Sequence, residues 1–181
     1  MNLKLFSVIF CALSTGFAQT RTPQEIVEQK CGVELREPAQ RVFAKVDDKQ
    51  PWKEFGRVAD VPELSLGFGT SAEMWSGRNH GLLIRTEEPG EDFDANTEYC
   101  FGQGGKLVQV AYEIRTAWGW GFRMNGNVLN GALHTDSKVY FNTETGKRML
   151  RPEGADDIRE ALRPSLFLTV NQLPFSQLLS K

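Results

Sequence analysis

A strict two-residue alternation between Val108 and Met124 constrains the fold of this chain more than any other feature. The even positions carry apolar or aromatic side chains with one threonine, whereas the odd positions are polar, charged or small. Because successive side chains of a strand point to opposite faces of a sheet, the pattern predicts one buried and one polar face. One-sided burial is typical of antiparallel sheets. The run is long for one strand, so we expect it to bend or split at Gly119 and Gly121.

Shorter patterns place other elements around this segment. We expect the strand at 97–101 to form a hairpin with the long run through Gln103-Gly104-Gly105, since Gly-Gly tolerates the positive φ angles of a tight turn. The apolar tail at 166–179 should dock on the domain. The remaining expectations are helices at 22–31, after Pro38 and at 156–162, strands at 64–68, 82–84, 128–133, 138–142 and 148–150, irregular chain through most of 47–80, and an acidic loop at 87–96.

These elements predict an α+β fold. Its main part is a bent antiparallel β-sheet of about five to seven strands, arranged as a meander. Short helices lie at the N-terminus and near the C-terminus. We expect a single domain at 19–181, which has enough length for a hydrophobic core.

The first 18 residues have the pattern of a secretory signal peptide. Lys4 gives a positive start, 5–13 is an uncharged apolar core, and Gly16 and Ala18 are small residues suited to cleavage after Ala18. The apolar run is shorter than the roughly 20 residues of a membrane-spanning helix. We therefore expect an exported protein, periplasmic or secreted, with no transmembrane segment after cleavage.

Cleavage would leave two cysteines, Cys31 and Cys100. An even number in an oxidising compartment favours a disulfide, and two free buried thiols are the alternative. In the expected hairpin Tyr99 and Phe101 share the core face, so Cys100 points to the opposite face. A disulfide to Cys31 would then hold the N-terminal helix over that second face.

Composition narrows the partners. The chain has 21 basic and 23 acidic residues and a net charge of −2, without a basic stripe, so we expect no nucleic-acid partner. No glycine-rich phosphate loop joins a strand to a helix. The chain also has fewer histidines and cysteines available than a zinc site needs. We expect no cofactor. An unknown protein or a small apolar ligand is the expected partner.

The motif Trp118-Gly119-Trp120-Gly121-Phe122 admits two interpretations. Trp118, Trp120 and Phe122 could form a ligand platform. We favour a core role, because the motif continues the phase of the preceding alternation. Arg115 and Arg123, on the polar face with Glu113, are candidates for binding an anionic group. Cross-strand ion pairs on a solvated face are the alternative.

Two further candidates lie in polar segments. Asp92, Asp94 and Asn96 place oxygen ligands at alternate positions, as a calcium loop begins, but the glycine and glutamate of an EF-hand are missing. We favour a solvated acidic loop there. His80, in a polar turn before a strand, could act as a general base with Glu87 or Asp92.

No catalytic motif is specific enough to name a reaction. We therefore expect a non-catalytic binding or interaction module of the cell envelope or extracellular space. One alternative is a carrier of a small apolar ligand in the concave face of the sheet. The other is a small hydrolase that uses His80 with nearby carboxylates.

Overall fold

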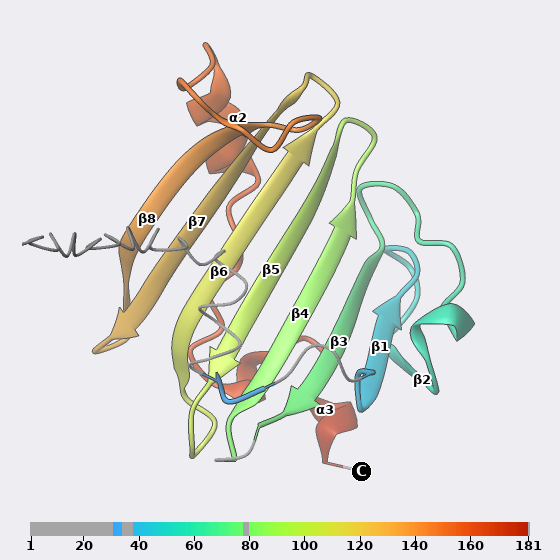
Figure 1. The fold of residues 1–181 in the computed structure, drawn as a ribbon. Coiled ribbons are helices and arrows are strands. Elements are labelled where there is room, and N and C mark those ends of the chain that lie inside the picture. The colour runs from blue at the N-terminus through green and yellow to red at the C-terminus, as the bar shows by residue number, and fades with distance from the viewer. Residues whose placement is uncertain (1–30, 34–37, 78–79, 181) are drawn as a thin grey trace, which may run out of the picture.

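The computed structural model describes residues 31–33, 38–77 and 80–180. They form one antiparallel sheet of nine strands in the order β2-β1-β3-β4-β5-β6-β7-β8-β9, with a few short helices (Figure 1). The strands are β1 (Arg41–Lys45), β2 (Lys53–Phe55), β3 (Thr70–Ser76), β4 (Leu82–Pro89), β5 (Phe93–Phe101), β6 (Leu107–Thr116), β7 (Trp120–Leu129), β8 (Ala132–Asn142) and β9 (Arg148–Met149). The helices are η1 (Val58–Asp60), α2 (Ala155–Ala161), η2 (Val170–Gln172) and α3 (Ser176–Leu179).

The antiparallel sheet is confirmed, but it has nine strands instead of five to seven. Two of the additional strands are β1, where we expected a helix after Pro38, and β3, where we expected irregular chain. In β1, the consecutive residues Val42, Phe43 and Ala44 are all buried, so the strand lacks the apolar–polar alternation that reveals a half-exposed strand. The expected strand at 64–68 is absent, and turns occupy much of it.

The acidic segment 87–96 is mostly strand, contrary to the expected loop. β4 continues to Pro89 and β5 begins at Phe93, so only 90–92 connect them. The expected strand at 128–133 is instead the tip of the β7–β8 hairpin. Asn130 and Gly131 have φ angles of 53° and 78°, the left-handed pair that a two-residue hairpin turn requires.

The β6–β7 hairpin explains why the alternation keeps its phase through a turn. Ile114 pairs with Phe122 and Tyr112 with Met124, so even positions face even positions across the hairpin. Gly119 forms the turn with φ 82°. The predicted split of the long run is therefore confirmed. Val108 breaks the pattern and is 39% exposed, because a register shift beside Phe101 turns Leu107 into the core instead.

The pairing register divides the side chains between two faces. The tail face carries Phe43, Ile84, Tyr99, Val110 and, further along, Ile114 and Phe122. The disulfide face carries Trp75, Leu83, Cys100, Ala111, Glu113 and Phe141.

The C-terminal segment covers the tail face, as the apolar tail predicts. In Figure 1 it passes behind the sheet from α2, near β7 and β8, to α3 near β1. Leu173 and Phe175 are buried in the main hydrophobic cluster, and the ring of Phe175 stacks on Phe43 at 4.7 Å. Backbone hydrogen bonds with the β5–β6 turn fix the middle of the segment, from Leu107 N to Leu168 O and from Val170 N to Gly105 O.

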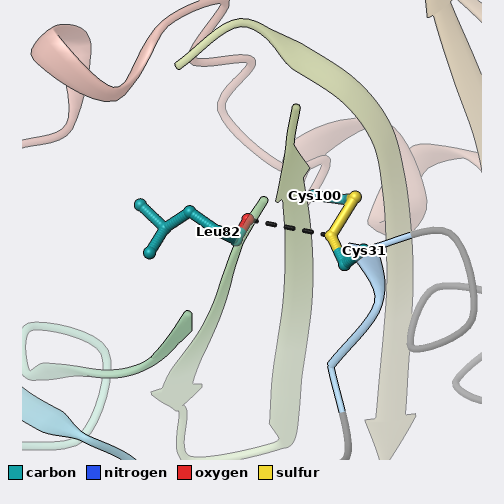
Figure 2. The surroundings of a disulfide bond; sticks show 3 residues. All are labelled: Cys31, Leu82 and Cys100. Atoms are coloured by element: carbon teal, nitrogen blue, oxygen red, sulfur yellow. Dashed lines mark hydrogen bonds between the residues drawn. A yellow bond between two sulfur atoms is a disulfide. The ribbon is translucent and has the colours of Figure 1, made fainter. Parts of the chain in front are cut away.

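The disulfide between Cys31 and Cys100 is present on the opposite face (Figure 2). The sulfur of Cys31 also lies 3.7 Å from the carbonyl oxygen of Leu82. Cys31 and Val33 pack on Trp75, Leu83 and Ala111. The predicted signal peptide at 1–18 and all but the last residue of the predicted helix at 22–31 lie outside the described residues.

Candidate functional site

The three aromatic residues of the predicted platform have different environments. Trp120 and Phe122 are 6% and 1% exposed and belong to a buried cluster with Tyr112 and Ile114. Trp118 is 54% exposed, because it lies in the β6–β7 turn beyond the last paired residues. It stacks on Trp120 with ring centres 6.4 Å apart. The core interpretation therefore holds for two of the three residues.

Arg115 and Arg123 lie on the disulfide face, away from these aromatics. Arg123 donates to Glu113 at 2.5 Å, and Arg115 contacts the same carboxylate at 3.1 Å. Both guanidinium groups also lie over the ring of Phe141: that of Arg123 is 4.0 Å from the ring centre and that of Arg115 is 5.7 Å from it. The arginines thus form a cross-strand ion-pair cluster with a buried aromatic ring, and the structure does not bring them to the tryptophans.

His80 and its expected acidic partners lie far apart along β4. His80 is in the turn before this strand, Glu87 is near the other end, and Asp92 is in the turn that follows it. Eight residues of extended chain span roughly 25 Å. Asp94 and Asn96 lie on β5, after the turn that holds Asp92. Within the described ranges, no three His, Cys, Asp or Glu side chains are grouped so that they could hold a metal.

A cleft of about 620 Å³ opens on the tail face, beside β7 and β8. Its floor consists of Tyr112, Phe122, Met124 and Leu133, which project from three neighbouring strands. Its opposite wall is the end of α2 and the extended chain that follows, where Pro164 and Leu166 add apolar surface. The volume lies within the range typical of sites for small organic ligands.

Two tyrosines hold this wall against the sheet. The hydroxyl of Tyr112 donates to Leu162 O, and that of Tyr99 donates to Ser165 O at 3.0 Å. Burial raises the pKa of both phenols well above the usual value of a tyrosine, so both remain protonated donors at neutral pH. The chain at 162–165 is therefore tied down along β5 and β6, and the cleft lies on its β7–β8 side.

Basic side chains surround the apolar floor. Lys138, Arg159 and Arg163 line the cleft together with one acidic residue, Glu160. Arg159 forms an ion pair with Asp156 at 2.9 Å, and its guanidinium lies 5.5 Å from the ring centre of Phe122. Arg163 pairs with Glu160 at 2.9 Å on the exposed side of the helix. Lys138 is exposed and forms no ion pair with another residue in the described part of the chain.

Sequence reasoning identified only Phe122 among the residues of this cleft. Tyr112 and Met124 were predicted to face inward, but a second wall was needed to turn that face into a site. Lys138 gave no signal, because Val139 and Phe141 marked the other face of β8 as the apolar one. Simple alternation along β8 could not place Leu133 either, because a register shift opposite Asn125 and Gly126 changes which face of the sheet the earlier residues of β8 point to.

Comparisons with protein-family models, curated proteins and solved structures give no match. In the part of the chain that the structure describes, no helix is long and apolar enough to cross a membrane.

Proposed function

We propose that this protein is a binding module that holds a small ligand with an apolar body in the cleft on its tail face. The observation that carries the proposal is an open cleft of about 620 Å³ whose floor is aromatic and aliphatic. A sheet face that serves only as core would be closed by its covering segment. Here the tail packs tightly around Phe175 but leaves Met124 and Leu133 partly exposed.

The distribution of polar groups favours binding over catalysis as the role of this cleft. Its titratable side chains are three basic residues, one glutamate and the protonated Tyr112. His80, Glu87 and Asp92, the residues of the hydrolase alternative, do not line it. Export through the leader at 1–18 remains part of the proposal and is supported by sequence alone.

The uncharged fluorophore N-phenyl-1-naphthylamine tests the proposal, because its emission rises when it enters an apolar site. We expect saturable enhancement with the wild-type protein. Met124→Glu should abolish most of it, since a carboxylate on the floor makes an apolar ligand costly to bind. Met149→Glu, on strand β9 outside the cleft, is the matched control and should bind as the wild type does.

Circular dichroism of both variants checks that the fold is retained. Absence of saturable enhancement with the wild type would refute the proposal. Equal enhancement with folded Met124→Glu would also refute it, because the fluorophore would then bind elsewhere.

A further inference from the structure

We infer that the ligand of this cleft carries a single anionic head group, which Lys138 and Arg159 recognise at the rim. The inference rests on the proposed function and adds the charge of the ligand. The balance of charged residues in the cleft is the reverse of that in the whole chain. Three basic residues and one acidic residue line the cleft, although acidic residues outnumber basic ones in the whole chain.

The ion pairs show which of these positive charges remain uncompensated. Arg163 and Glu160 neutralise each other, and their side chains are 71% and 65% exposed. Asp156 is shared by two arginines, Arg151 at 2.6 Å and Arg159 at 2.9 Å, so this group keeps a positive excess. Lys138 has no acidic partner among the described residues.

The position of each cation separates the head of the ligand from its body. Lys138 pairs directly across the strands with Met124, so the ammonium group extends from the edge of the apolar floor. Arg159 lies over Phe122 and is oriented by Asp156, and its Nη1 also lies 3.3 Å from the hydroxyl of Tyr140. A ligand body on Met124 and Leu133, the partly exposed residues of the floor, would thus place a carboxylate or sulfonate between the two cations.

A second polar group would find little compensation inside the cleft. The floor offers the thioether of Met124 and the hydroxyl of Tyr112, which already donates to Leu162 O, and the wall adds one uncharged polar side chain, that of Ser165. Burying an unpaired polar group costs free energy. The cleft therefore suits a single-headed amphiphile, such as a medium-chain carboxylate, better than a sugar or a nucleotide.

The test compares three ligands with the same alkyl chain below their micelle-forming concentrations: decanoate, decan-1-ol and decyltrimethylammonium. Each is titrated against protein-bound N-phenyl-1-naphthylamine. We expect decanoate to bind about five-fold more tightly than the alcohol and the cationic ligand to bind most weakly. Raising the ionic strength should weaken decanoate binding and leave the alcohol unchanged.

Lys138→Met should remove most of the advantage of decanoate while leaving alcohol binding intact. Lys49→Met is the matched control and should behave as the wild type. It removes an exposed lysine that follows β1, at the opposite edge of the sheet from the cleft. Arg159 is left unchanged, because its pairing with Asp156 also supports α2.

The outcomes separate this inference from the proposed function. Equal affinities for decanoate and the alcohol in the wild type would overturn the anionic head group but leave apolar binding in place. Tightest binding of decyltrimethylammonium would also overturn the anionic head group, because the cleft would then prefer a cation. Failure of all three ligands, together with failure of the fluorophore, would overturn the proposed function as well.

Discussion

Gly121 shows how one residue without a side chain allows two strands to share an aromatic ring. A Cβ atom at this position would lie 2.3 Å from Cζ of Phe141 and 2.7 Å from Ile114 O. Phe141 pairs with Gly121 across β7 and β8 and is 1% exposed. The sequence indicates that something approaches this glycine closely, but it does not show that the approaching group comes from a strand 20 positions later.

Gly121→Ala should therefore destabilise the protein by about 1–3 kcal/mol, the usual cost of overpacking a filled site. The measurement is the free energy of unfolding in urea. Gly56→Ala is the control, because a Cβ there meets only a side-chain oxygen of Asp60 at 3.4 Å and should change stability little. A wild-type value for Gly121→Ala would mean that Phe141 does not lie over the glycine.

At the scale of elements, strands whose sequence alternates between apolar and polar or small residues were predictable, and strands without that alternation were not, although the structure buries much of both faces of β6. The long alternation identified β6 and β7, and Gln103-Gly104-Gly105 identified the turn before them. β1 was mistaken for a helix because it is covered on both faces and carries no polar alternation. The acidic run of β4 was mistaken for a loop because Glu87 and Glu88 face solvent at the end of a paired strand.

The disulfide was predictable from the two cysteines that the expected cleavage leaves, and the alternation of the hairpin strand gave the face of Cys100. The bridge closes a loop with a sequence separation of 69, so replacing both cysteines by serine should lower the free energy of unfolding by about 4 kcal/mol. Reduction of the wild type should bring its stability to that of the double variant, and the variant should not respond to reductant. Thiol titration of the unreduced full chain should find at most Cys11 free. Detection of three free thiols would contradict the bridge.

At the scale of the whole molecule, the sheet has two differently covered faces. The disulfide fastens Cys31 and Val33 to one face, and the C-terminal segment crosses the other from α2 to α3. Docking of the tail was predictable from its apolar composition. The cleft was not, because it depends on the spacing between 163–166 and β8, two segments that only the folded sheet brings together.

The most direct test of the account is a titration of isotope-labelled protein with decanoate, followed by the backbone amide shifts in NMR spectra. A ligand in the cleft should perturb Met124, Leu133, Lys138 and Leu166 in a saturable manner. The amides of Trp75 and Cys100, whose side chains lie on the disulfide face, should move little. Shifts concentrated around Trp75 and Cys100, or none at all at saturating ligand, would contradict a binding cleft on the tail face.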